Sequence, residues 1–308
     1  MSQPQISVVM PAYNSGMFIR EALASALAQR GVALEVVVVD DGSSDDTVAQ
    51  VESFGDRVRL VRQANQGSAV ARNRGVAEAR ASHVAFLDAD DYWHPDKLAK
   101  QLALLQAGAD LVYSRFSLWH AGADGRFPAA AAHLAACVAS GQMSNPSGDG
   151  WIYIELLLDC VVWTSTVVAS KALIEQVGGF DPSLRKGQDY DLWLKLAHAA
   201  QWRVVPESLA LYRMHAESIT HTVKPENFEY RILNGAYERW GLRNPDGRQL
   251  DERIMQERLA RSARSFADAH LMGGSRETAA KFYRIALKHR RWMPRVWLNY
   301  ARATCLPL

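Results

Sequence analysis

The sequence lacks long hydrophobic runs, although 48% of its 308 residues are hydrophobic. No uninterrupted apolar stretch reaches about 18 residues, the length that a membrane-spanning helix needs, so we expect no such helix. The first residues, Met1–Gln5, carry none of the positive charge of a signal peptide, and the apolar run that follows is too short to be one. We therefore expect a cytoplasmic protein.

Cysteine is scarce, and the glycine motifs that cradle phosphate are absent. The three cysteines, Cys137, Cys160 and Cys305, are odd in number and far apart, which favours neither a disulfide framework nor a zinc site. No G-x-x-x-x-G-K-[ST] occurs, and the single G-x-G, at 148–150, does not follow a first strand. A nucleotide site in this chain must therefore hold its phosphates differently, through carboxylates and a divalent cation.

Three carboxylates, Asp88, Asp90 and Asp91, stand directly after the apolar run 84–87. Carboxylates this close repel one another unless a positive charge lies between them. A divalent cation that is also bound by a substrate's phosphates would remove that repulsion. The alternative is a turn in which these residues cap a helix that begins near Pro95.

Short apolar runs alternate with helical patterns over the first 90 residues. The expected strands are 7–11, 34–39, 58–61 and 84–87, and the expected helices are 18–29, 47–54 and 69–79. Such alternation indicates right-handed βαβ units in an open parallel sheet. Ligands bind such sheets beyond the carboxyl ends of the strands, where the polar loops after the first, second and fourth strands lie. The sequence therefore predicts an α/β fold with a nucleotide-type site at that edge.

The middle of the chain is less regular. We expect a strand at 161–168, a helix at 171–177 and a further helix that opens at or just before Asp189. A last short strand is expected at 209–213. The stretch 120–150 is rich in small residues, and long loops in compact domains are usually functional or mobile.

Two tryptophans follow this stretch, Trp151 and Trp163. An acceptor-binding flap is one interpretation of residues 120–150, and both indoles are then candidates for stacking on a sugar ring. Packing in the core is the commoner fate of a tryptophan.

Helical patterns dominate the end of the chain, at 228–240, 251–271, 276–289 and 294–303. We therefore expect a catalytic domain of residues 1–222 and a helical extension of residues 223–308. The plain interpretation of the extension is a set of helices packed on the catalytic domain.

Charge is divided unevenly between these two parts. From residue 225 onward there are 16 Lys and Arg against 9 Asp and Glu, whereas the first 224 residues hold 19 against 24. Basic residues near the end of the chain are interleaved with Trp292, Trp297 and Tyr300, which is typical of a surface that binds anionic lipid. No segment resembles a nucleic-acid module, so we expect no nucleic-acid partner.

Several motifs, taken in order, resemble those of the family-two inverting glycosyltransferases of GT-A fold, of the bacterial polysaccharide and lipopolysaccharide type. They are SVVMPAYN at Ser7–Asn14, VDDGSSD at Val39–Asp45, NQG at Asn65–Gly67, ARNRG at Ala71–Gly75 and FLDADD at Phe86–Asp91. The resemblance covers roughly the first 220 residues, and several ordered motifs are more specific than any single one. It implies a GT-A α/β fold, with a mostly parallel central sheet flanked by helices, followed here by the helical extension.

The resemblance also implies the donor site. In that family the residue at the position of Asp41 reads a uracil-type base, with Tyr13 against it, while Arg72 lies near the nucleotide and Asp88 meets the ribose. The full set of nucleotide-sugar-binding residues that it implies is Pro11, Tyr13, Asp41, Arg72, Asp88 and Ala89. The alternative for Arg72 is a solvated arginine on a helix face, which is the usual fate of arginine.

The same resemblance implies a metal site and a catalytic base. Asp90 would bind Mn²⁺ or Mg²⁺, and His215 would approach the ion; an imidazole ligand suits Mn²⁺ better. Asp189 stands at the position of the base, with Asp191 as the second candidate, and Gln188 replaces the Glu of many members. The alternatives are a helix-capping role for Asp189 and an ordinary surface or core histidine.

The predicted function is therefore a metal-dependent inverting transfer of a sugar from a nucleoside diphosphate donor, UDP-linked, to a glycan or lipid-linked glycan. A basic aromatic end that binds lipid would place the enzyme at the inner face of the membrane. One alternative is a sugar-1-phosphate nucleotidyltransferase, but the loop 12–16 lacks the Gly-rich, Arg- and Lys-bearing sequence expected there. A non-catalytic sugar-nucleotide or membrane-surface binding module is the other, and it would release no UDP.

Overall fold

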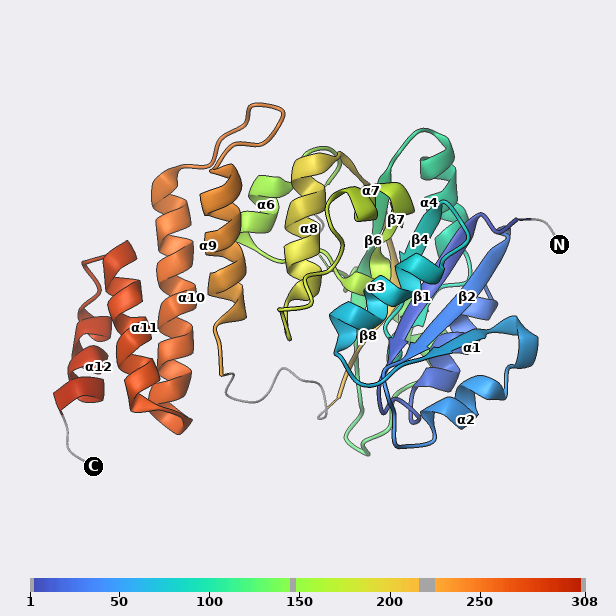
Figure 1. Cartoon of the computed structure of the whole chain (residues 1–308), viewed down its shortest axis with the longest axis horizontal. Coiled ribbons are helices and arrows are strands. Elements are labelled where there is room, and N and C mark those ends of the chain that lie inside the picture. Colours follow the sequence, from blue (N-terminus) through green and yellow to red (C-terminus); the bar gives the residue numbers. More distant parts are fainter. Residues whose placement is uncertain (1–2, 145–147, 216–224, 306–308) are drawn as a thin grey trace. The chain divides into compact units, whose positions relative to one another are not determined.

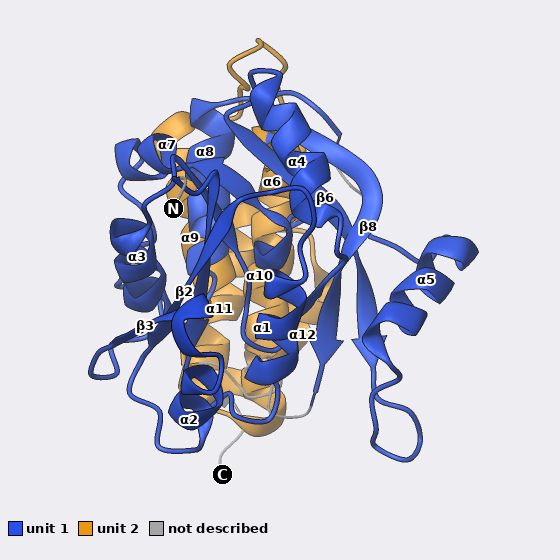
Figure 2. Ribbon diagram, turned by 90° about the vertical axis from the view of Figure 1, so that its right-hand side faces the viewer, with its two compact units in different colours: residues 1–152, 160–215 blue, residues 153–159, 216–308 orange. Residues whose placement is uncertain are grey.

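The computed structural model of the chain describes residues 3–144, 148–215 and 225–305 (Figure 1). The chain divides into two compact units, one of residues 1–152 and 160–215 and one of residues 153–159 and 216–308 (Figure 2). Within these described stretches, no helix combines the length and apolar character that a membrane crossing requires.

The first unit is built on a sheet whose described strands lie in the order β3-β2-β1-β4-β7-β6-β8-β5. Its strands are β1 (Ile6–Ala12), β2 (Leu34–Asp40), β3 (Arg59–Arg62), β4 (His83–Phe86), β5 (Tyr92–Trp93), β6 (Leu111–His120), β7 (Val168–Ser170) and β8 (Trp202–Met214). Strands β1 to β4 are parallel, as are β6 and β8, whereas β5 and β7 are antiparallel to their neighbours. The predicted α/β class is confirmed.

Helices cover both faces of this sheet (Figure 1). They are α1 (Ile19–Leu27), α2 (Thr47–Glu52), α3 (Ser68–Glu78), α4 (Lys97–Gln106), α5 (Ala130–Ser140), α7 (Lys171–Gln176) and α8 (Gln188–Ala199), with a 3₁₀ turn at Gly55–Arg57. Strand β2 shows why both faces are covered: Val36 and Val38 join the core that contains α1 and α4, whereas Val37 and Val39 pack with Ala71 of α3. A strand buried on both sides reads as an unbroken valine run.

Helix α3 approaches β1 very closely. A Cβ atom at Gly75 would lie 2.3 Å from a methyl carbon of Val9, so only glycine allows this approach. At the end of the helix, the Nζ of Lys171 donates to the carbonyl oxygens of Ala77 and Ala79, at 3.2 and 2.9 Å. The close approach of Gly75 to Val9 sets the distance between α3 and β1, and the two hydrogen bonds from Lys171 hold the end of α3 in place.

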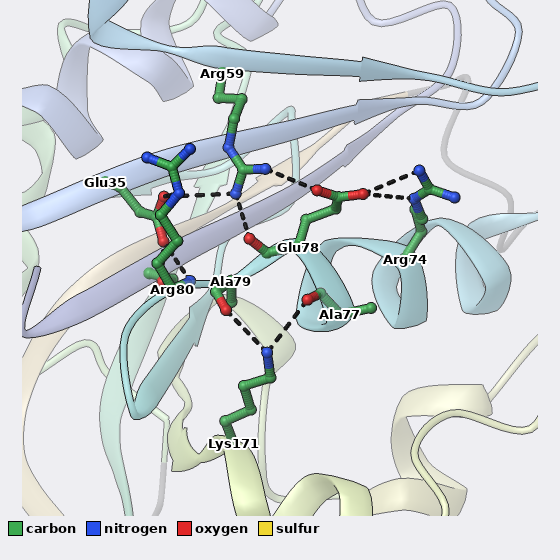
Figure 3. Close-up of polar contacts among 9 residues, drawn as sticks. Glu35, Arg59, Arg74, Ala77, Glu78, Ala79, Arg80 and Lys171 are labelled. Carbon is green, nitrogen blue, oxygen red and sulfur yellow. Dashed lines mark hydrogen bonds and ion pairs between the residues drawn. The ribbon is translucent and has the colours of Figure 1, made fainter.

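Ion pairs add to the anchoring of this helix end, as Figure 3 shows. The carboxylate of Glu78 pairs with Arg74 and Arg59, both within 3.0 Å. Arg59 also lies 3.5 Å from Glu35 of β2, which accepts hydrogen bonds from Ser7 and from the backbone N–H of residue 80. The network therefore joins α3 to β2 and β3.

Three sequence-based expectations need correction. The stretch 161–168 is not a continuous strand, because a 3₁₀ turn at Thr164–Thr166 precedes the short β7. The expected long loop 120–150 contains helix α5. The strand expected at 209–213 is the end of β8, which begins at Trp202 and pairs in parallel with β6.

The second unit consists of helices. They are α6 (Tyr153–Leu158), α9 (Phe228–Trp240), α10 (Glu252–Gly273), α11 (Arg276–His289) and α12 (Pro294–Cys305). Three of them begin at side chains that accept a backbone hydrogen bond, Asn227, Asp251 and Ser275, as expected for helix N-caps. The expected helical extension is thus present.

The second unit also recruits a segment from the middle of the chain. The hydroxyl of Tyr153 donates to the carbonyls of Ala236 and Gly241, and Arg258 donates to the carbonyl of Leu158. The boundary predicted between residues 222 and 223 lies outside the described residues.

Candidate functional site

The loops after β1 and β2 are tied together at the carboxyl edge of the sheet. The N–H of Ser15 donates to Thr47 Oγ1 at 2.7 Å, and that of Gly16 donates to Asp45 Oδ2 at 2.9 Å. A Cβ atom at Gly16 would lie 1.8 Å from the Oδ1 atom of Asp46, so a larger residue here would displace that side chain. Pro11 lies in β1, and Tyr13 lies in the loop that follows this strand and is exposed.

Asp41 follows β2 and is buried. Its Oδ1 accepts hydrogen bonds from Gln63 Nε2 and the N–H of Gln66, at 2.8 and 2.9 Å, and its Oδ2 accepts one from the N–H of Gly67 at 2.8 Å. Asp41 therefore positions the loop that leads into α3, a role that its family resemblance does not indicate.

Arg72, in the first half of α3, forms an ion pair with Asp88 at 2.6 Å and is buried. Burial lowers the pKa of this guanidinium, but the charges of Asp88, Asp189 and Asp90 outweigh it and leave the pKa raised. Burial also raises the pKa of Asp88, aided by Asp90 and Asp189, while Arg72 opposes the shift. Three predicted site carboxylates thus act on one arginine.

Two of the three nitrogens of this guanidinium, Nε and Nη1, are buried without a hydrogen-bond partner in the part of the chain that the structure describes. The Oε1 atom of the buried Gln188 is in the same condition, although its Nε2 donates to Ser68 at 2.6 Å. Buried polar atoms without partners are costly, and they are expected where a ligand supplies the missing contact.

Asp90 Oδ2 lies 3.0 Å from His215 Nε2, across 125 residues of sequence. The histidine ring also packs against Phe18, with the ring centroids 4.8 Å apart. Within the described residues no group of three or more His, Cys, Asp or Glu side chains could hold a metal ion. A carboxylate and an imidazole nonetheless fit an ion whose other ligands are phosphate oxygens and water.

Asp91 has different surroundings from its neighbours. Its Oδ2 accepts hydrogen bonds from Trp163 Nε1 at 2.7 Å and Ser165 Oγ at 2.5 Å, and its Oδ1 accepts one from the N–H of Arg213 at 3.2 Å. Burial, with the charges of Asp90 and Asp88, raises the pKa of Asp91 well above its ordinary value. Its carboxyl group therefore supports the turn.

Arg213, near the end of β8, is a structural member of the site that the sequence analysis did not single out. Its Nε donates to the carbonyl of Asp90 at 2.7 Å, and its Nη2 pairs with Glu21 of α1 at 2.6 Å. Its guanidinium carbon lies 3.8 Å from the ring centre of Trp119 and 4.7 Å from those of Phe18 and Phe127. A charged residue directly after the run 209–212, two positions before His215, was the available signal.

Helix α8 places its two acids differently. Asp189 Oδ2 accepts a hydrogen bond from Thr164 Oγ1 at 3.0 Å, and its Oδ1 accepts one from the N–H of Tyr190. Asp191 instead forms an ion pair with Lys195 at 2.6 Å, one turn along the helix. The charge of Asp189 contributes to the raised pKa of Arg72 on α3.

The two tryptophans that follow the stretch 120–150 lie in different places. Trp163 packs against Tyr212, with ring centroids 3.7 Å apart, and bonds to Asp91. Trp151 lines a cavity of about 620 Å³ with Asp110 and Arg203, residues that precede or begin β6 and β8. That cavity is at the amino end of those strands, whereas His215 follows the carboxyl end of β8, so Trp151 is not part of the site.

The structure therefore brings Arg72, Asp88, Asp90, Asp189 and His215 to one region, with the buried Ala89 between two of them. Pro11 lies near the end of β1, and Tyr13 and Asp41 lie on the neighbouring loops of the same sheet edge.

Comparison with known proteins agrees with this architecture. The family model described as glycosyl transferase family 2 matches residues 7–129. The succinoglycan biosynthesis protein ExoO of Rhizobium meliloti is 33% identical over 276 residues, covering 85% of this chain and 76% of its own.

Two solved structures share the fold. That of S. aureus TarS 1-349 in complex with UDP-GlcNAc has a TM-score of 0.65 at 17% identity and covers 97% of this chain and 90% of its own. That of the mannosyltransferase PcManGT from Pyrobaculum calidifontis, in complex with GDP-Man and Mn²⁺, has a TM-score of 0.53 at 19% identity, over 98% and 85% of the two chains. The expected GT-A architecture is confirmed. The chain belongs to glycosyl transferase family 2, and it is a glycosyltransferase.

Proposed function

We propose that this glycosyltransferase moves a sugar from a nucleoside diphosphate donor, UDP-linked, to a hydroxyl of a glycan or lipid-linked glycan, with inversion at the anomeric carbon. The observation that carries the proposal is the buried guanidinium of Arg72, which has two unpartnered nitrogens and three carboxylates acting on it. An anionic diphosphate is a ligand that can accept hydrogen bonds from both of these nitrogens and that is attracted by the positive charge of the guanidinium.

The donor would lie along the loops of the carboxyl edge. Tyr13 is exposed there, and Asp41 retains acceptor capacity beside the hydrogen bonds it already accepts. We assign Pro11, Tyr13 and Asp41 to the nucleoside, and Arg72, Asp88 and Ala89 to the ribose and diphosphate. The complexes of TarS with UDP-GlcNAc and of PcManGT with GDP-Man support a nucleotide-sugar donor for this fold.

Asp90 and His215 would hold a divalent ion, Mn²⁺ or Mg²⁺, with the diphosphate as its remaining partner. Such an ion neutralises charge that develops on a leaving phosphate oxygen. Both side chains are half-buried, and the His215 Nδ1 atom has no partner among the described residues.

Asp189 is proposed as the general base. The acceptor O–H bond breaks as the proton passes to the Asp189 carboxylate, and the oxygen forms its new bond to the anomeric carbon. The bond from that carbon to the diphosphate breaks in the same step, and its electron pair leaves with the nucleoside diphosphate. A single displacement of this kind inverts the configuration.

Release of UDP from a panel of UDP-sugars, with and without Mn²⁺ and a glycan acceptor, tests the reaction. Asp90→Ala should weaken UDP binding in the presence of Mn²⁺ at least about tenfold, since it removes a charged ligand, and it should leave metal-free UDP binding little changed. Calorimetry measures both. Equal UDP affinity of the wild type and the variant across Mn²⁺ concentrations would remove Asp90 from the proposal.

The two alternatives, a sugar-1-phosphate nucleotidyltransferase and a non-catalytic binding module, are not proposed, because the chain belongs to a glycosyltransferase family.

A membrane surface remains a proposed partner. Trp292, just before α12, is 83% exposed, and Trp297, on α12, is 51% exposed. The basic residues Lys288, Arg291 and Arg295 are exposed as well. Exposed indoles with lysine and arginine suit an anionic bilayer surface, which would keep the enzyme near a lipid-linked acceptor at the inner face of the membrane.

A further inference from the structure

The 3₁₀ turn at Thr164–Thr166 carries three consecutive hydroxyl side chains, and all three residues are buried. Burial of a hydroxyl group is unfavourable unless it is hydrogen-bonded. The partners of these hydroxyls therefore show what the segment holds in place.

Ser165 is joined to two residues of the acidic turn, residues 88–91, and to Trp93 of β5. Its Oγ accepts a hydrogen bond from the N–H of Asp88 at 3.0 Å and donates one to Asp91 Oδ2 at 2.5 Å. Its carbonyl oxygen accepts from Trp93 Nε1 at 2.6 Å. A single residue from a distant part of the chain thus sets the path of residues 88–93.

The two residues before Ser165 form hydrogen bonds with carboxylates from two different parts of the chain. Trp163 donates its indole N–H to Asp91 at 2.7 Å, and Thr164 donates its hydroxyl to Asp189 at 3.0 Å. Asp189 is on α8 and Asp91 follows β4, so two adjacent residues contact both the proposed base and the acidic turn.

Thr166 fixes the segment to the core. Its hydroxyl donates to the carbonyl of Trp163 at 2.6 Å and closes the turn. Its own carbonyl accepts from Nε2 of Gln101, a fully buried side chain of α4, at 2.7 Å. The segment is therefore held at its carboxyl end by a group that has no part in the site.

We propose that Trp163–Thr166 is a brace that sets the distance between the proposed base and the acidic turn. Thr164 is a positioning residue for Asp189, and Ser165 is a positioning residue for the turn that carries Asp88 and Asp90. The inference rests on the proposed function, because it takes Asp189 as the base and the turn with Asp88 and Asp90 as part of the donor site.

The first test compares two substitutions of one residue. Thr164→Val keeps the shape but loses the hydroxyl, whereas Thr164→Ser keeps the hydroxyl but loses a methyl group. We expect Thr164→Val to lower kcat at least about tenfold with KM for the donor within about twofold, as for a contact that matters in the transition state. Thr164→Ser should stay within about threefold of the wild type.

The second test separates the acidic turn from the base. Ser165→Ala should weaken UDP binding in Mn²⁺ about tenfold, since two hydrogen bonds to the turn are lost. Ser117→Ala is the matched control, because that buried hydroxyl donates to the carbonyl of Gln142 and pairs with Ser208, away from the carboxylates. Thermal unfolding of all four variants checks that each is folded.

Equal rates for Thr164→Val and Thr164→Ser in an active protein would overturn the base half of the brace. Unchanged UDP affinity in Ser165→Ala, or an equal loss in Ser117→Ala, would overturn the other half. A wild-type protein that releases no UDP from any donor counts against the proposed function instead. The affinity of Ser165→Ala is measured without turnover, so it still decides the role of Ser165 in that case.

Discussion

Asp189 and Asp191 lie two residues apart on α8 and differ in what they contact. Asp189→Asn keeps an oxygen that can accept from Thr164 but removes the proton acceptor. We expect sugar transfer to fall about 10²- to 10⁴-fold, the usual contribution of a general base. UDP binding in Mn²⁺ should stay within about twofold, and calorimetry beside a UDP-release assay measures the two effects.

Asp191→Asn is the matched control. The substitution breaks the ion pair with Lys195, which also approaches the carbonyl of Gly179, so the main loss should be in thermal stability. Turnover within about threefold of the wild type is expected, because no transition-state contact is removed. If Asp191→Asn were the inactive variant and Asp189→Asn the active one, the two roles would have to be exchanged.

Lys97 offers a test of how a buried charge affects stability. It is fully buried, donates to Gln101 at 2.7 Å and lies 4.1 Å from the ring centre of Trp93. Burial lowers the pKa of its ammonium group well below the ordinary 10.5. Between that lowered value and 10.5 the unfolded chain binds more protons, so the free energy of unfolding rises with pH in this window.

Lys97→Met should flatten this rise. The measurement is the urea midpoint of both proteins at pH values from about 7 to about 10, since methionine keeps much of the side-chain length without the titrating group. Parallel pH profiles for the two proteins would show that Lys97 binds its proton equally in the folded and unfolded states.

The sequence indicates which carboxylates belong to the candidate site, but it does not indicate the role of each one. The carboxylates 88, 90 and 91 stand out because three acids follow an apolar run. Their separate tasks depend on partners such as Ser165, Arg213 and His215, which lie at least 74 residues away in sequence. No local pattern contains such pairings, since they arise only when β4, β8 and the 3₁₀ turn meet.

Helix α3 is the element on which the site depends most, because it carries Arg72. Lys171→Met removes the two hydrogen bonds to the carbonyls of Ala77 and Ala79 (Figure 3). We expect a loss of about 1 to 2 kcal/mol in the free energy of unfolding, since a charged donor at a helix end is lost. Urea unfolding monitored by circular dichroism gives the value.

Lys100→Met provides the comparison for this substitution. Its ammonium group pairs with Glu207, but both side chains are more than a third exposed, so the expected change is at most about 0.5 kcal/mol. Equal losses in the two variants would indicate that Lys171 contributes no more than a surface ion pair.

Helices were easier to predict than the segment before β7. Patterns of period 3.6 gave α9 and α11 with the residue bounds that the structure shows, because one apolar stripe must face a core. The stretch 161–168, VVWTSTVV, has the β-branched composition of a strand. The hydroxyls of Thr164 and Ser165 are instead satisfied by Asp189 and Asp91 from distant parts of the chain, and that tertiary requirement overrides the local preference.

The division of charge along the chain leads to a test on the whole 308-residue chain. Binding to vesicles that contain anionic lipid should occur at low salt and weaken as salt is added, because the attraction is screened. The double substitution Arg291→Glu with Arg295→Glu should reduce co-sedimentation at least about tenfold, since each basic residue near the surface contributes about 1 kcal/mol.

Arg57→Glu with Arg126→Glu is the matched control, with the same change in net charge at exposed positions of the first unit. If both double variants lost binding equally, net charge and not the surface of α12 would explain it. Absence of binding by the wild type at low salt would reject the membrane partner.

The sequence by itself determined the α/β class and the helical end of the chain, and it predicted a site at the carboxyl edge of the sheet. These follow from local periodicity and from the order of strands and loops, which are local features of the sequence. The tertiary structure decided which acid supports the turn, which pairs with His215 and which is held by Thr164. It also assigned residues 153–159 to the second unit. Such choices depend on burial and on partners distant in sequence, and only the folded chain supplies both.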